Sequence, residues 1–238
     1  MLSNEELLRY SRQIELENFG IEGQEKLKQA KVLIVGVGGL GSIASLLLVG
    51  AGLGKIGLMD KDSVSLTNLH RQLIYREEQI GKSKVDMAKK NLSLLNSNCD
   101  IVVYDEYLTE ENAEKIISEY DIVMDCCDNF KTRYVINDAC LRLGKPFVYS
   151  SIEAFRGQIA FFEPNNGKAN YRTLYPNESE LKQKENSSKA VIATLPALAA
   201  TLAVNEVIRF FVNGKSELED RLLCVDLNTL SFQIFDLE

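Results

Sequence analysis

The stretch KVLIVGVGGLGSIASLLLVGAGLGKIGLMDKD, residues 31–62, decides the fold. An apolar run turns through four glycines, continues as an apolar helical pattern and reaches a second apolar run that ends at Asp60. Gly36, Gly38 and Gly41 fit the spacing G-x-G-x-x-G between a strand and a helix. Such glycines let the backbone approach phosphate, the helix N-terminus presents N–H donors, and the acid after the next strand binds a ribose hydroxyl. The stretch therefore predicts a nucleotide-binding fold, and a glycine turn that serves packing alone is the weaker interpretation.

The alternation of strand and helix patterns continues along the chain. Apolar strand runs at 31–36, 55–60, 100–105 and 121–125 alternate with helical patterns at 40–52, 82–96, 109–120 and 130–143. This alternation predicts an α/β fold with a doubly wound, Rossmann-like and mostly parallel sheet. Further on, GQIAFFEP and the closing RLLCVDLNTLSFQIFDL predict antiparallel strands, the last two joined around Asn228.

The length of 238 residues and the hydrophobic content of 45% predict one domain over 1–238. We expect N-terminal helices in 1–29, where Ser3 and Glu6 offer a capping box, and a nucleotide-binding core in 30–150. Residues 164–189 are rich in Asn, Glu, Lys and Ser, a composition that favours a mobile crossover loop. A C-terminal helix and strands follow in 190–238.

Charge and apolar patterning exclude several classes of function. Lys and Arg number 27 against 34 Asp and Glu, a net charge of −7, so nucleic acid and anionic membrane are disfavoured as partners. The charged N-terminus does not resemble a signal peptide, and the uncharged stretch 190–205 is shorter than the ~20 residues of a membrane span. The five cysteines form no C-x-x-C pair, which indicates reduced thiols. We therefore expect a cytoplasmic protein whose partners are small molecules or proteins.

The segment after Asp60, DKDSVSLTNLHRQLIYREEQIGKSKVDMAKKN, separates two kinds of nucleotide site. Asn68, Arg71 and Lys84 place polar and cationic groups above the strand ends, where a triphosphate needs cations. A nicotinamide instead needs a hydride partner held against its ring. Lys84 alone would equally fit a solvated lysine in a first helical turn. The segment favours ATP.

Five motifs together carry a resemblance to a known family. RYSRQI, GVGGLG, DKDSVSLTNLHRQ, IGKSKV and DCCDNFKTR occur in the order and spacing of the ThiF/MoeB/HesA adenylyltransferases, which are relatives of the ubiquitin-activating enzymes. The resemblance covers nearly the whole chain. It implies an enzyme that binds ATP and Mg²⁺, adenylates the C-terminal glycine carboxylate of a small ubiquitin-like sulfur-carrier protein and releases pyrophosphate.

The resemblance also implies roles for individual residues. Gly39 would approach the phosphates, Asp60 would hold the ribose, and Asp128 would engage the magnesium with Asn129 beside it. Arg12 matches an arginine that reaches the ATP of a neighbouring subunit, which implies a homodimer. The implied catalytic residues are Arg12, Arg71, Lys84 and Asp128. The implied nucleotide contacts are Gly36, Gly38, Gly39, Gly41, Asp60, Thr67, Asn68, Leu69, His70, Arg71, Lys84, Asp128 and Asn129.

The chemistry of this reaction suits the residue types. A carboxylate that attacks the α-phosphorus approaches another anion, so fixed cations supply most of the stabilisation. No general base is required, because a C-terminal carboxylate is already ionised at neutral pH. His70, the single histidine of the chain, is then a bystander and neither a catalyst nor a metal ligand.

The sequence departs from this family at its cysteines. Many members carry two zinc-binding C-x-x-C pairs, but Asn170 and Thr173 stand at the first pair's positions and no second pair is present, so we expect no zinc site. Ser187 and Ser188 lie where many members have a reactive cysteine, and we interpret Cys126 and Cys127 as small apolar residues. The expected product is the acyl-adenylate, with sulfur delivered by another protein.

Two other functions remain open from the sequence. An NAD-dependent oxidoreductase would keep the Gly36 to Asp60 unit but would leave Arg71, Lys84 and DCCDN without roles. A non-catalytic protein that binds nucleotide and docks a carrier would need none of the cations. The identity of the carrier, its pathway, and the choice between a folded carrier and a peptide as acyl substrate are also left open.

Overall fold

The structure is a computed structural model, and it describes residues 1–183 and 190–237. The strands of this part of the chain form one eight-stranded sheet in the order β3-β2-β1-β4-β5-β6-β7-β8. Their bounds are β1 (Lys31–Val35), β2 (Lys55–Met59), β3 (Asp100–Tyr104), β4 (Ile122–Asp125), β5 (Phe147–Glu153), β6 (Arg156–Phe162), β7 (Arg221–Asp226) and β8 (Ser231–Asp236).

Strands β1 to β5 pair in parallel, and β5 to β8 pair antiparallel. The mostly parallel sheet with antiparallel C-terminal strands is therefore confirmed, including the last hairpin around Asn228. Because β1, β2 and β4 are parallel neighbours, the segments that follow them meet at one edge of the sheet.

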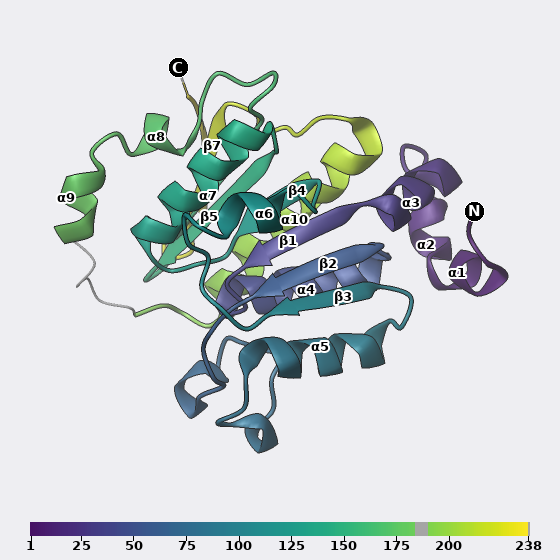
Figure 1. Ribbon diagram of the computed structural model, residues 1–238. Coiled ribbons are helices and arrows are strands. Elements are labelled where there is room, and N and C mark those ends of the chain that lie inside the picture. The colour runs from purple at the N-terminus through teal and green to yellow at the C-terminus, as the bar shows by residue number, and fades with distance from the viewer. Residues whose placement is uncertain (184–189, 238) are drawn as a thin grey trace.

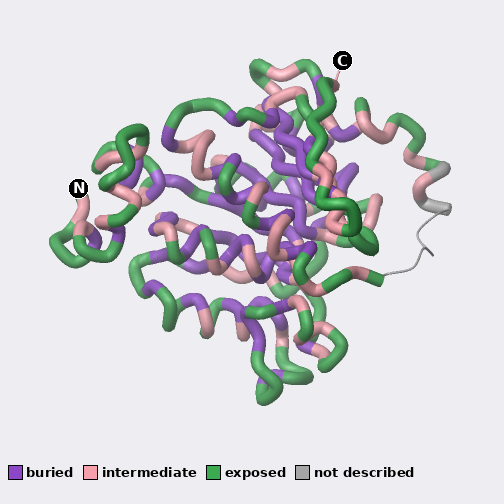
Figure 2. Tube along the Cα trace, turned by 180° about the vertical axis from the view of Figure 1, so that it is seen from behind, coloured by how far each residue is buried: buried purple, intermediate pink, exposed green. Residues whose placement is uncertain are grey.

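Helices cover both faces of the sheet (Figure 1). One apolar cluster joins the sheet to α4 (Gly39–Ala51), α5 (Lys84–Leu95) and α10 (Thr194–Asn213), and a second joins it to α6 (Ala113–Ile117) and α7 (Phe130–Leu143). Figure 2 shows the buried residues concentrated along the strands and the helix faces turned toward them. The doubly wound arrangement is confirmed.

The N-terminal helices lie where β1 begins, as Figure 1 shows. They are α1 (Asn4–Arg9), which begins with the predicted Ser3–Glu6 capping box, α2 (Ser11–Ile14) and α3 (Gly20–Gln29). The Tyr10 hydroxyl accepts a hydrogen bond from Asn96, and the Gln13 amide donates to the carbonyl of Ala51 at the end of α4. The RYSRQI motif thus anchors these helices to the core.

Two stretches differ from the predicted patterns. Helix α6 covers only part of the predicted 109–120, because the Asn112 side chain accepts from the Thr109 N–H and donates to the carbonyl of Tyr107, bonds that compete with helix formation. The expected crossover loop at 164–189 contains two short helices, α8 (Tyr171–Leu174) and α9 (Glu178–Gln183). Residues 184–189, with Ser187 and Ser188, lie outside the described residues, and mobility of the segment stays a prediction.

Helix α10 is the one helix in the described ranges that is long and apolar enough to cross a membrane, and half of its most apolar window is buried in the protein. It packs on α3, α4, β5 and β6. The sequence-based expectation of a core helix agrees with this packing. Two short 3-10 turns, η1 (Leu66–Asn68) and η2 (Glu77–Gln79), lie between β2 and α5.

Candidate active site

The glycine loop between β1 and α4 packs closely against the segment that follows β4. Gly36 has φ +93°, and a Cβ on it would lie 2.6 Å from the carbonyl oxygen of Cys126. A Cβ on Gly41 would collide with the carbonyl oxygen of Gly36. At both positions only glycine fits, so the predicted motif has a structural reason in this chain. The loop delivers the N-terminus of α4, with its free N–H donors, to the edge of the sheet.

Asp60 joins the end of β2 to this loop. One carboxylate oxygen accepts a hydrogen bond of 2.8 Å from the Val37 N–H, and the other accepts one of 2.9 Å from the Asp62 N–H. Burial raises the pKa of the Asp60 carboxyl, while the nearby charge of Lys84 acts in the opposite direction. Asp60 is thus held against the glycine loop, as a ribose acceptor must be.

Lys84, the first residue of α5, directs its ammonium group toward the carboxylates of Asp60 and Asp62. Its Nζ lies 2.8 Å from a carboxylate oxygen of Asp62 and 3.7 Å from one of Asp60, and its side chain is only 6% exposed. The interpretation of Lys84 as a solvated lysine is therefore wrong. Asp62 was not among the predicted site residues. It lies two positions after Asp60, so the end of β2 brings both carboxylates to this site.

Arg71 reaches the glycine loop from the turn that follows η1. Its Nη1 donates to the carbonyl of Thr67 at 3.1 Å and contacts Nε2 of His70 at 2.6 Å. Its Cδ lies 3.6 Å from where a Cβ on Gly39 would be. The carbonyl of Asn68 accepts from two N–H groups of the turn, and Leu69 packs against the core. The turn therefore places a guanidinium beside the glycine loop.

The segment after β4 is fixed by a buried ion pair that the sequence did not reveal. Asp125 is fully buried and accepts at 3.0 Å from Nε of Arg133, which is 8% exposed. Asp125 also accepts from the Cys127 N–H, and Nη2 of Arg133 donates to the Cys127 carbonyl. Asn129 caps α7 by accepting from the Thr132 N–H. Asp128 stands between these two fixed residues, and the only signal for the clamp was the arginine that ends DCCDNFKTR.

Arg12 is the predicted catalytic residue that the fold does not bring to this place. It lies on α2 with its side chain 90% exposed and pairs only with Glu15 among the described residues. Its neighbour Gln13 contacts Ala51, the last residue of α4, whereas Gly39 is the first. A helix rise of 1.5 Å per residue separates these two ends by about 18 Å. Arg12 therefore sits at the far end of α4 from the glycine loop of its own chain.

The described cysteines and carboxylates form no metal centre. No group of three or more His, Cys, Asp or Glu side chains among the described residues could hold a metal ion. At the positions of the expected first cysteine pair, Asn170 caps α8 by accepting from the Arg172 N–H, and the Thr173 hydroxyl accepts from the Asn170 N–H. Burial raises the pKa of the Cys126 and Cys127 thiols well above their usual range, so neither is a ready nucleophile.

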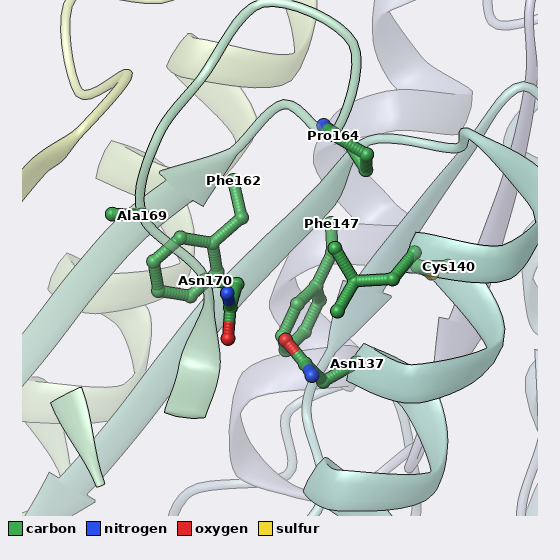
Figure 3. A pocket seen from close by; sticks show the side chains of 8 residues that line it. Asn137, Cys140, Phe147, Phe162, Pro164, Ala169 and Asn170 are labelled. Atoms are coloured by element: carbon green, nitrogen blue, oxygen red, sulfur yellow. The ribbon is translucent and has the colours of Figure 1, made fainter. Parts of the chain in front are cut away.

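A small cavity lies elsewhere, beneath the start of the crossover segment (Figure 3). Its volume is about 10 Å³, and Phe147, Phe162, Pro164 and Cys140 are among its lining residues. Asn137 at its edge accepts from the Tyr171 N–H. A space of this size holds at most one water, so it is a packing defect.

Comparison with known proteins identifies the family of the chain. The profile of the ThiF family matches residues 10–238. The chain is 42% identical over 233 residues to the adenylyltransferase and sulfurtransferase MOCS3 of Culex quinquefasciatus, covering 98% of this chain and 53% of that protein. It is 40% identical over 236 residues to the sulfur carrier protein adenylyltransferase of Thermus thermophilus, covering 97% of this chain and 87% of that protein.

Solved structures show the same fold at low sequence identity. E. coli MccB with ATP superposes with a TM-score of 0.84 at 23% identity, covering 96% of this chain and 70% of that one. PaaA superposes with a TM-score of 0.85 at 23% identity, covering 99% and 75%. The fold is that of an α/β protein with a doubly wound sheet, and Arg71 and Lys84 lie beside its glycine loop and Asp60. The chain belongs to the ThiF family, and it spans about half the length of the MOCS3 relatives it matches.

Proposed function

We propose that this protein adenylates the C-terminal carboxylate of a small sulfur-carrier protein with ATP and releases pyrophosphate. The observation that carries the proposal is the convergence of Arg71 and Lys84 on the Gly36–Asp60 unit. A triphosphate carries more negative charge than the diphosphate of a nicotinamide dinucleotide, so two cations at this loop favour ATP. The names of the MOCS3 and Thermus relatives support the reaction, and the MccB structure with ATP supports the nucleotide.

Each residue has a role that its place allows. Asp60 accepts from the ribose hydroxyls, and the N–H groups at the start of α4 bind phosphate oxygens. Lys84 exchanges its contact with Asp62 for the triphosphate, and Arg71 binds the phosphates from the other side of the loop. Asp128, fixed between Cys127 and Asn129, would hold Mg²⁺ against the phosphates, and the ion would neutralise charge on the leaving pyrophosphate. The carboxylate attacks without a general base because it is already ionised.

The site is completed by a second subunit in this proposal. Arg12 is exposed and lies at the far end of α4 from its own glycine loop, so a symmetric homodimer is the arrangement in which it can reach an ATP. The cytoplasm is the proposed location. The protein stops at the acyl-adenylate in this proposal, because the raised pKa of the Cys126 and Cys127 thiols leaves little thiolate to take up the acyl group.

The test is carrier-dependent exchange of labelled pyrophosphate into ATP. Candidate carriers are folded ubiquitin-like proteins with a C-terminal glycine, and the matched control is the same carrier with its C-terminal carboxylate amidated. We expect exchange with the intact carrier only, and no binding of NAD in competition with ATP. Exchange that a free C-terminal peptide supports equally well would make a peptide the substrate. Binding of NAD without exchange would refute the proposal.

A further inference from the structure

The contact between His70 and Arg71 defines the state of the imidazole. Nη1 of Arg71 lies 2.6 Å from Nε2 of His70. A guanidinium can only donate hydrogen bonds, so Nε2 must be the acceptor. In this arrangement His70 thus serves as a hydrogen-bond acceptor for Arg71 through Nε2.

The same contact decides which edge of the guanidinium is available. Nη1 carries two hydrogens, and its two acceptors are the carbonyl of Thr67 and the ring of His70. Nε and Nη2 of Arg71 have no acceptor within the described residues. These two nitrogens form the edge that binds a phosphate through two parallel hydrogen bonds. Arg71 is held beside Gly39, so this edge is presented at the phosphate loop.

We propose that His70 is a positioning residue, which fixes the guanidinium of Arg71 for bidentate binding of the ATP phosphates. The proposal rests on the proposed function, because it assigns the triphosphate to this loop. It differs from both sequence-based interpretations of His70, as a bystander and as a direct nucleotide contact. His70 is exposed, and its side chain makes no other hydrogen bond among the described residues, so its effect on ATP binding acts through Arg71.

The experiment measures Mg·ATP binding by calorimetry for the full chain and its variants at one pH. His70→Ala removes the acceptor and should weaken binding about 2- to 10-fold. His70→Gln supplies an amide oxygen as a neutral acceptor and should bind close to wild type.

A double-mutant cycle separates positioning from direct contact. In an Arg71→Ala background, His70→Ala should cause no further loss, because its effect acts through the guanidinium. Additive losses, or binding by His70→Gln that is as weak as binding by His70→Ala, would each overturn the proposal. Unfolding temperatures of the variants should stay at the wild-type value. If ATP binding depends on His70 but no pyrophosphate exchange occurs, the proposed function alone is refuted. If exchange occurs and ATP binding does not depend on His70, this inference alone is refuted. If the protein does not bind ATP at all, both are refuted.

Discussion

Replacement of Arg71 by alanine should separate activity from stability. In the free protein the side chain of Arg71 bonds only to Thr67 and His70 among the described residues, both within four positions in the chain, and it forms no described ion pair. Its removal should therefore change the free energy of unfolding by no more than about 0.5 kcal/mol. The transition state loses a fixed cation at the phosphates, which costs about 10²-fold in rate, or about 2.7 kcal/mol.

The measurement is kcat/KM for pyrophosphate exchange beside thermal unfolding. Arg76→Ala is the matched control, because Arg76 lies on the same segment, is exposed, and its side chain bonds only to the Leu73 and Tyr75 carbonyls among the described residues. We expect Arg76→Ala to keep nearly full activity. An Arg71→Ala enzyme with nearly full activity would refute the role, and so would an equal loss in Arg76→Ala or a loss explained by unfolding.

Three further predictions concern other parts of the site. Lys84→Met should abolish most exchange and lower the free energy of unfolding by about 1 to 2 kcal/mol. The loss is smaller than for a fully buried ion pair because Asp62 is exposed. The control Lys82→Met should change neither exchange nor stability. Because burial raises the pKa of Cys126 and Cys127, their thiolate fractions at about pH 8 should be negligible, and iodoacetamide should label them only after unfolding; rapid labelling of the native protein would contradict this. Mixing Arg12→Ala subunits with Asp128→Ala subunits should restore exchange, because one composite site of the heterodimer is intact, and no recovery after verified subunit exchange would argue against action in trans.

The sequence predicted most where a local pattern determines the structure. The glycine spacing, the strand alternation and the Ser3–Glu6 capping box each depend on neighbours in the chain, and all three appear as expected. Asp60 could be predicted as well, because its place follows from the strand that it ends.

The remaining features depend on contacts that local patterns do not encode. The Asp125–Arg133 pair forms because α7 folds back over the end of β4, and the burial of Lys84 depends on carboxylates that arrive from β2. The two helices in the crossover segment form although its composition favours a loop, and α8 is held to α7 by the pair of Arg172 with Asp138. The orientation of Arg71 depends on His70, whose hydrogen-bonding role no spacing rule indicates.

The central claim is that the protein forms an acyl-adenylate on a carrier, and mass spectrometry of the carrier tests it most directly. After incubation with the protein, ATP and Mg²⁺, the account predicts a carrier heavier by one adenylyl group, which hydroxylamine converts to the hydroxamate and which Asp128→Ala does not form. A carrier with no ATP-dependent change in mass would contradict the account, as would a reducible covalent complex mapped to Cys126 or Cys127.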